Sequence, residues 1–140
     1  MQKSTRPAIK VVAGLIFRND QLLICQRRET AAFALKWEFP GGKVENEENG
    51  AAALQRELKE ELAVEVREAE LVAEYEHCYK DGPSVFLQFY RVTNFAGAPK
   101  NLVFQQMLWV DLDELKTFDF LDGDRRLIEQ IVGQKDGLPK

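Results

Sequence analysis

The chain has 140 residues, of which 45% are hydrophobic and 30% are charged, with a net charge of −4. This length and balance are typical of one globular domain, so we predict a single domain over residues 1–140 that folds without a disulfide or a structural metal. The negative charge argues against a broad basic surface, and therefore against duplex nucleic acid as a partner.

Cysteine usage and the N-terminal residues bear on the compartment. Cys25 and Cys78 lie far apart in predicted strands and lack CxxC spacing, which favours buried free thiols, with a disulfide as the less favoured alternative. The N-terminus has no apolar segment of the secretory kind, and no run of the chain is long enough to span a membrane. We therefore predict a cytoplasmic protein that does not bind membranes.

Apolar, β-branched runs predict strands at residues 9–17 and 21–27, joined by a turn at residues 18–20 and followed by a loop over residues 28–36. A helix is predicted over residues 50–62. Further strands are predicted at residues 64–66, 71–79, 84–92 and 107–110.

Turn-forming residues separate the later elements, with a turn at residues 80–83 and a Gly/Pro loop at residues 94–101. One helical turn at residues 113–117 precedes a final amphipathic helix at residues 125–132. Strands and helices are mixed rather than strictly alternating. This order predicts an α+β fold with a mixed β-sheet between helices.

The predicted helix over residues 50–62 carries acids on one side. Asn49 is a suitable N-cap, and a leucine at every fourth position forms an apolar stripe. Glu57, Glu60 and Glu61 have the spacing i, i+3, i+4, so their carboxylates lie within one turn of each other. Like charges packed in this way repel unless the helix face is simply solvated, which is the alternative interpretation.

A divalent cation would turn this repulsion into attraction. Mg²⁺ prefers oxygen ligands and often bridges carboxylates to substrate phosphates. Gly41 and Gly42 precede the helix, and glycines allow positive φ and a close approach of the backbone to a ligand, so a carbonyl there can join the carboxylates. Arg56 lies beside the acids and is predicted to hold a glutamate in place by a salt bridge.

This stretch resembles the Nudix box: glycine, five residues, glutamate, seven residues, then Arg-Glu-apolar-x-Glu-Glu-x-Gly-apolar. The matching residues are Gly42, Glu48 and the run from Arg56 to Val64. Ala63 is the one departure, since it stands where the family has a glycine that forms a left-handed helix cap. We expect this alanine to cost about 1 kcal/mol or to change the turn.

The flanking sequences WEFPGGKVE and QRR are similar to the MutT branch of the family. The resemblance implies a Nudix-type α/β/α sandwich that cleaves a nucleoside triphosphate to the monophosphate and pyrophosphate. It implies Mg²⁺, or Mn²⁺ in its place, held by the Gly41 carbonyl with Glu57, Glu60 and Glu61. Either Glu57 or Glu60 would orient or deprotonate the attacking water, and Arg56 would support them.

The resemblance also implies substrate contacts. Arg27 would hold a phosphate, Phe39 would line the base pocket, and Asp124 would contact the base. Each has an alternative role: a surface arginine, a core aromatic and an N-cap for the last helix, for which Asp122 competes. Some MutT-like enzymes carry a further glutamate six residues before a tryptophan, but here Val103 stands at that distance from Trp109.

Several functions remain open. An oxidised nucleotide such as 8-oxo-dGTP is the first candidate substrate. An ionised Asp124 would favour a base with an amino donor, which makes CTP, dCTP or 5-methyl-dCTP an alternative, whereas a protonated Asp124 could also bond to an oxo group. Hydrolysis of ADP-ribose or of an RNA 5′ end, and a non-catalytic binding module, are further alternatives. The protein is expected to be a monomer or a homodimer.

Overall fold

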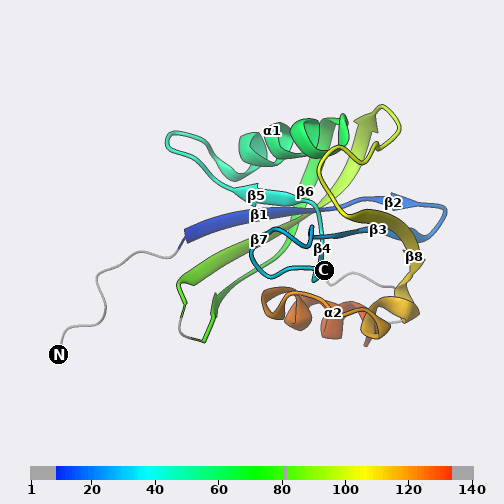
Figure 1. The fold of residues 1–140 in the computed structure, drawn as a ribbon. Helices are drawn as coiled ribbons and strands as arrows, with labels where there is room; N and C mark the ends of the chain where they lie inside the picture. The colour runs from blue at the N-terminus through cyan, green and yellow to red at the C-terminus, as the bar shows by residue number, and fades with distance from the viewer. Residues whose placement is uncertain (1–8, 81, 134–140) are drawn as a thin grey trace.

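The computed structural model describes residues 9–80 and 82–133. Within these residues, two four-stranded sheets lie between two α-helices (Figure 1). The first sheet has the order β5-β1-β7-β6 and contains β5 (Gly41–Lys43), β1 (Ile9–Leu15), β7 (Ser84–Ala96) and β6 (Glu65–Cys78). The second contains β2 (Phe17–Arg18), β3 (Gln21–Gln26) and β4 (Trp37–Glu38), with β8 (Gln106–Asp111) paired to β3.

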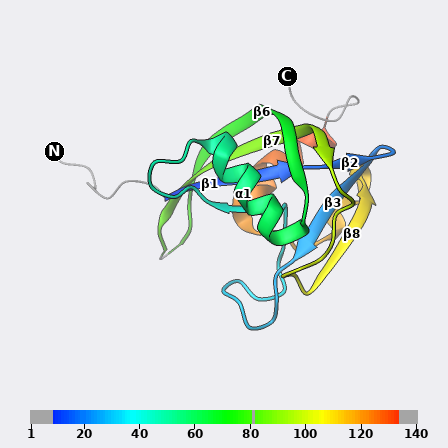
Figure 2. The same cartoon turned by 90° about the horizontal axis from the view of Figure 1, so that it is seen from above.

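The first sheet is mixed. Strand β1 runs parallel to β7, from the pair Ile9↔Val85 to the pair Leu15↔Arg91, whereas β5 pairs with β1 and β6 pairs with β7 in antiparallel fashion. Helix α1 (Gly50–Leu62) covers one face and α2 (Arg125–Val132) lies on the opposite side, as the two views of Figures 1 and 2 agree. The predicted α+β fold with a mixed sheet between helices is therefore confirmed.

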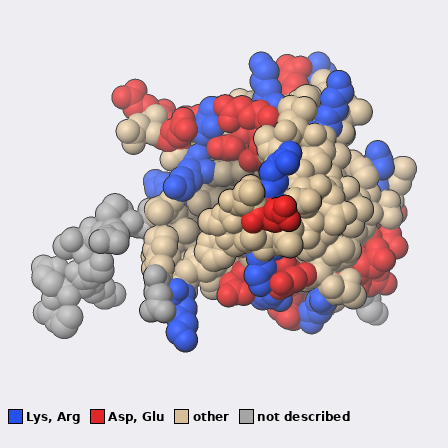
Figure 3. Space-filling model, viewed as in Figure 1, with Lys and Arg blue, Asp and Glu red and all other residues tan. Residues whose placement is uncertain are grey.

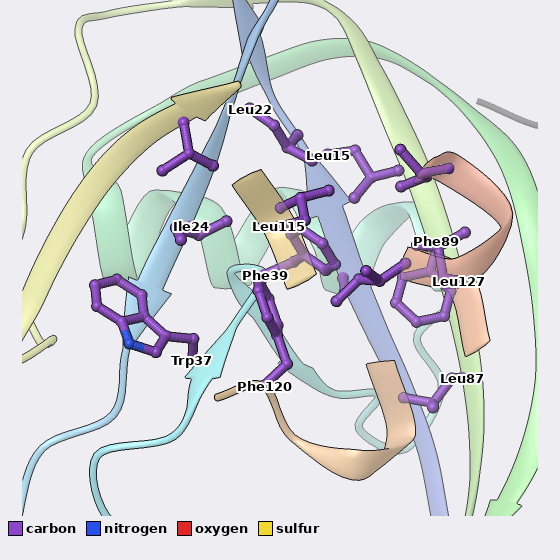
Figure 4. Packing of buried hydrophobic residues seen from close by; sticks show 14 of the residues in the cluster. Leu15, Leu22, Ile24, Trp37, Phe39, Leu87, Phe89, Leu115, Phe120 and Leu127 are labelled. Carbon is purple, nitrogen blue, oxygen red and sulfur yellow. The ribbon is translucent and has the colours of Figure 1, made fainter. Parts of the chain in front are cut away.

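Two apolar clusters hold the layers together, one on each side of the first sheet. The cluster under α1 contains Leu54, Leu58 and Leu62, each fully buried, so the predicted leucine stripe is the face of α1 that docks on the sheet. The cluster on the α2 side is rich in aromatic rings, and Phe39 packs against Phe120 at its centre with ring centroids 5.2 Å apart (Figure 4).

Helix α1 begins and ends where the sequence predicts. The Asn49 side chain accepts a hydrogen bond from the Ala52 N–H at 2.8 Å, which satisfies one free donor of the first turn. Ala63 adopts the left-handed conformation, with φ 58° and ψ 35°, and its N–H points back to the carbonyls of Leu58 and Lys59. The alanine therefore keeps the family's left-handed cap and does not change the turn.

Several strand predictions need correction. Residues 9–17 do not form one strand, because the chain changes sheet at Ile16, between β1 and β2. The strands predicted at 64–66 and 71–79 are one long strand, β6, in which register shifts absorb the irregular alternation. Strand β7 continues to Ala96, three residues into the predicted loop that begins at Asn94.

Smaller features also differ from expectation. Both cysteines are free thiols as predicted, but Cys78 is exposed at the end of β6 rather than buried. The single helical turn is a 3₁₀ helix, η1 (Leu112–Thr117), and a second short 3₁₀ helix, η2 (Asp122–Asp124), leads into α2. The chain ends of the predicted domain and Asp81 of the predicted turn lie outside the described residues. Neither described helix is long and apolar enough to cross a membrane.

Candidate active site

The two glycines of the turn are required by close contacts. A Cβ on Gly41 would lie 2.0 Å from the Val12 carbonyl oxygen, and the φ of Gly41 is 156°, so no other residue fits. Gly42 does not have positive φ, but a Cβ there would lie 2.5 Å from the Glu57 carboxylate, so this glycine allows a close approach. The missing side chain of Gly42 therefore lets the first acid of α1 pack directly against the turn.

Arg56 ties the turn, the following loop and the acids of α1 together. Its Nε donates to Glu48 at 2.7 Å, its Nη2 donates to the Lys43 carbonyl at 3.0 Å, and its Nη1 lies 3.1 Å from Glu57 and 3.3 Å from Glu60. The hydrogen bond from Arg56 lowers the pKa of Glu48 to about 2. The predicted salt bridge of Arg56 is thus a network, which fixes the carboxylates relative to β5.

Glu57 and Glu61 face each other at the buried end of this network. Glu61 accepts a hydrogen bond from the Gly41 N–H at 3.1 Å, and the two carboxyls lie close enough to share a hydrogen bond. Burial raises the pKa of both groups, and their mutual repulsion adds to the rise for Glu61. Two carboxylates with this environment would be stabilised as ions by a nearby cation.

The carboxylate and carbonyl oxygens near the turn fit a hard divalent cation, but the three carboxylates of α1 do not converge on one point in the described structure. Among residues 9–80 and 82–133, no three His, Cys, Asp or Glu side chains converge closely enough to hold a metal ion. The Glu60 side chain is 59% exposed and pairs with Arg56. Arg56 binds only Oε1 of Glu60, so coordination of a cation through Oε2 would leave this ion pair in place. Carboxylate and carbonyl oxygens are the ligands that Mg²⁺ and Mn²⁺ prefer.

A cavity of about 400 Å³ opens beside the glycine turn. This volume lies within the range of small-molecule sites. Its wall includes all three residues of β5 and both Phe39 and Asp124, which the sequence assigned to base recognition. Phe39 is a core aromatic, 3% exposed, and it also lines the cavity; its contact with a base stays a prediction.

Asp124 is a buried acid rather than a helix cap. It occupies the N-cap position of α2, but its side chain makes no capping hydrogen bond, and the residue is 5% exposed. The competing Asp122 is exposed and pairs with Arg125 at 3.2 Å. Burial raises the pKa of Asp124 well above its ordinary value, with a further contribution from Glu38, while a hydrogen bond from the Phe39 backbone opposes the rise. Burial thus favours the neutral form of this carboxyl relative to its balance in water.

Arg27 lines the same cavity and is already engaged within the protein. Its Nε donates to the Ala32 carbonyl at 2.7 Å, and its Nη1 lies 3.2 Å from the Glu38 carboxylate. Among the described residues Nη2 has no hydrogen-bond acceptor, so it can still donate to a ligand. The role of Arg27 as a phosphate ligand stays a prediction.

The sequence interpretation missed three residues of this cavity. Glu38 in β4 is partly buried, with 17% of its side chain exposed, and loss of solvent raises its pKa to about 7 despite the ion pair with Arg27. Phe33 and Tyr79 also line the cavity, one from the loop after β3 and the other from the chain after β6. The motif WEFPGG contained a signal for Glu38, since an acid directly between two large apolar residues, Trp37 and Phe39, is a candidate for burial.

The segment before β8 offers no substitute for the acid that some MutT-like enzymes carry there. Val103 is 41% exposed, and its carbonyl accepts a hydrogen bond from Arg28 Nε at 2.7 Å. Gln106 is bonded to Gln26 across the second sheet at 2.9 Å. The acids available near the glycine turn are therefore those of α1 and Glu38.

The mixed-sheet sandwich, with its glycine turn packed against an acidic helix, is the arrangement expected of a Nudix-type domain. The chain belongs to the NUDIX domain family, whose model matches residues 8–131. It is 33% identical to the CTP pyrophosphohydrolase of Escherichia coli K12, over 94% of this chain and 96% of that protein.

Two other relatives represent the MutT branch. The 8-oxo-dGTP diphosphatase of Haemophilus influenzae is 35% identical, over 90% of this chain and 93% of that protein. A solved MutT structure, from work on the Aliivibrio salmonicida and Vibrio cholerae proteins, superposes with a TM-score of 0.78 at 32% identity and covers 91% of this chain and 99% of that one. The chain is thus a MutT-like member of the family, and the two curated relatives carry different substrate names at similar identity.

Proposed function

We propose that the protein is a Mg²⁺-dependent pyrophosphohydrolase that converts a nucleoside triphosphate and water into the monophosphate and pyrophosphate. The observation that carries this proposal is that the glycine turn lines the cavity and also packs against Glu57 of the acidic helix. The same hollow touches Asp124 and Phe39 at one side and Gly41, Gly42 and Lys43 at another, and a Cβ on Gly42 would meet the Glu57 carboxylate. A base and its phosphates can therefore be held together.

Each residue near the turn has a distinct part in this proposal. The Gly41 carbonyl with Glu57, Glu60 and Glu61 would hold Mg²⁺, which when bound neutralises phosphate charge and lowers the pKa of a coordinated water. Glu57 or Glu60 orients the attacking water and accepts its proton. Arg56 keeps these carboxylates in place through its bonds to Glu48 and to the Lys43 carbonyl.

The state of Asp124 bears on the base. A neutral carboxyl has one O–H donor and one carbonyl acceptor, so it forms two hydrogen bonds with an edge on which a donor and an acceptor are adjacent. Cytosine has such an edge in N3 and the N4 amino group. Oxidised guanine has another in O6 and the N7–H of the 8-oxo form, whereas ordinary guanine shows two acceptors there. A neutral Asp124 would therefore fit 8-oxo-dGTP or a cytidine triphosphate, and it would separate 8-oxo-dGTP from dGTP only if it faced the O6/N7 edge, because both guanines also present O6 beside N1–H.

A nucleotide panel with product analysis tests the proposal. The panel contains 8-oxo-dGTP, dGTP, CTP, dCTP, 5-methyl-dCTP and ADP-ribose, each with Mg²⁺, for the parent protein and for Glu60→Gln. We expect pyrophosphate release from a triphosphate by the parent and a large loss in Glu60→Gln. Release of single phosphates, equal release by the two proteins, or cleavage of ADP-ribose alone would contradict it.

Asp124→Asn provides a matched variant for the base contact. An amide keeps one donor and one acceptor at nearly the same positions but cannot ionise. We expect Asp124→Asn to retain preference for 8-oxo-dGTP over dGTP, and Asp124→Ala to lose it. Equal discrimination by all three proteins would remove Asp124 from base recognition without affecting the proposed reaction.

A further inference from the structure

Phe33 is a large aromatic residue that the core does not use. It lies in the loop between β3 and β4, its side chain is absent from both core clusters, and the residue is 52% exposed. Its backbone has φ 54°, in the left-handed region that residues other than glycine rarely adopt. Folding alone therefore gives little reason for an aromatic ring at this position.

The ring of Phe33 forms part of the cavity wall together with Tyr79. The two ring centroids are 5.2 Å apart with planes inclined at 38°, and both residues line the cavity beside Asp124. A hydrogen bond holds Tyr79 in place: its hydroxyl accepts at 3.2 Å from the N–H of Gly123, the neighbour of Asp124. The Phe33–Tyr79 pair is thus linked to Asp124, because Tyr79 is hydrogen-bonded to Gly123, the residue that directly precedes Asp124.

The loop that carries Phe33 is held by hydrogen bonds to Arg27, the proposed phosphate ligand, which lines the same cavity. Arg27 Nε donates to the carbonyl of Ala32, which directly precedes Phe33, and the Leu35 N–H donates to the Arg27 carbonyl at 3.2 Å. The Arg27 side chain also bonds to Glu38 at the cavity wall. A ligand that contacts Arg27 therefore lies next to the segment that positions the Phe33 ring.

We propose that Phe33 is a substrate-binding residue that stacks on the nucleobase and closes the cavity against Tyr79. This inference rests on the proposed function, in which a nucleotide occupies the cavity. A base placed beside the ring would cover its exposed half, and stacking on an aromatic ring is available to every base because each has a π-face. Phe33 then provides affinity for nucleobases in general, and Asp124 provides discrimination among them.

The test compares three variants of the loop by NMR titration of the full chain. Phe33→Leu removes the ring but keeps an apolar side chain, and Phe33→Tyr restores a ring. Leu35→Ala is the matched control, because Leu35 lies in the same loop, is 44% exposed and has φ 64°, yet does not line the cavity. The probes are CMP and dGMP, with ribose 5-phosphate as a probe that has no base.

We expect Phe33→Leu to raise the Kd for both monophosphates by about 10-fold, in line with the loss of one stacking contact. Phe33→Tyr and Leu35→Ala should bind them like the parent, and ribose 5-phosphate should bind the parent and Phe33→Leu equally. Ring-proton shifts of Phe33 on addition of CMP should accompany binding. The same Kd for CMP and dGMP in the parent and Phe33→Leu, or an equal loss for ribose 5-phosphate, would overturn the inference.

Failure of the inference can be told apart from failure of the proposed function. Monophosphate binding is measured without turnover, so a parent that binds CMP but hydrolyses no triphosphate contradicts the function and leaves the stacking result to be judged on its own. A parent that hydrolyses triphosphates while Phe33→Leu has unchanged Kd values and unchanged KM contradicts only the inference. A parent that binds no nucleotide contradicts both.

Discussion

The position of a Cβ on Gly42 lies 2.5 Å from the carboxylate of Glu57, so the glycine turn and the first acid of α1 fit together only without a side chain. Gly42→Ala must push this carboxylate away from the turn. Because a misplacement of about 1 Å in a reacting site costs roughly 100-fold in rate, we expect kcat to fall by about that factor, with a smaller change in stability. Steady-state kinetics and urea unfolding measure the two effects.

Gly82→Ala is the control, since the nearest atom to a Cβ on Gly82 is Tyr79 Cβ at 3.4 Å. A similar loss of kcat in both variants would contradict the prediction.

Arg56 positions three glutamates at once through its planar guanidinium group, which lysine cannot reproduce. We expect Arg56→Lys to weaken Mg²⁺ activation and to lower kcat by roughly 10- to 100-fold, as replacement of outer ligands of metal sites does. The measurement is the Mg²⁺ dependence of turnover. Arg67→Lys serves as the control, because Arg67 is 57% exposed and pairs with Glu65 at 3.6 Å. Normal Mg²⁺ activation in Arg56→Lys would exclude the proposed positioning role.

Ala63 keeps the left-handed cap of α1 at an energetic cost that glycine does not incur. We predict that Ala63→Gly raises the free energy of unfolding by about 1 kcal/mol and leaves kcat unchanged, because the residue shapes the turn after the acids. Urea unfolding checks this. The same change inside the helix should have the opposite effect on stability. At the exposed position Ala51 in α1, we expect Ala51→Gly to lower the free energy of unfolding by roughly 0.5–1 kcal/mol. Destabilisation by both changes would be inconsistent with this account.

Glu38 makes the stability depend on pH with a definite sign. Its pKa is about 7 in the fold against an ordinary value of 4.5, mainly because the carboxyl is buried. The folded chain therefore holds this proton more tightly than the unfolded chain, so Glu38 lowers stability as pH rises from 4.5 to about 7 and adds no further change above that range. The side chain is 17% exposed, and the effect amounts to roughly 3 kcal/mol.

The variant Glu38→Gln removes this titration while its amide oxygen can still accept a bond from Arg27. We expect the decline in unfolding free energy between pH 4.5 and about 7 to be smaller in the variant than in the parent. Asp124 and Glu61, whose pKa values Glu38 raises, should lose part of that rise in the variant, which changes the pH dependence in the same direction. Glu129→Gln, at a side chain that is 66% exposed, should follow the parent. Parallel curves for the parent and Glu38→Gln would show that the pKa of Glu38 is not raised.

The sequence predicted the elements whose causes are local. The bounds of α1 follow from the Asn49 cap and the leucine period, and those of α2 follow from a strong apolar face. The short strands β4 and β5 were missed because two or three residues carry no periodicity. They exist only through partners far along the chain, such as Gln26 for Trp37 and Val11 for Lys43.

The site residues divide in the same way: some could be predicted from the local sequence, and others depend on contacts between residues far apart in the chain. The residues of the Nudix box could be assigned from their spacing and the family resemblance, and the structure brings them together around the glycine turn. The burial of Glu38 and the pairing of Phe33 with Tyr79 depend on how the loop after β3 folds back over β6, which no local pattern encodes. The raised pKa of Asp124 likewise arises from tertiary burial.

The central claim is that the acids of α1 hold a divalent cation together with a polyphosphate. Figure 3 shows acidic and basic side chains interleaved over α1 and the loop before it, so a general negative surface potential would not by itself attract a cation to this face. Carboxyl-carbon NMR of the glutamates, recorded during Mn²⁺ titration with a non-hydrolysable nucleoside triphosphate analogue, tests the claim directly. The account predicts selective broadening of Glu57, Glu60 and Glu61, and its loss in Glu57→Gln. Signals of these three glutamates that stay as sharp as that of Glu129 throughout the titration would contradict it.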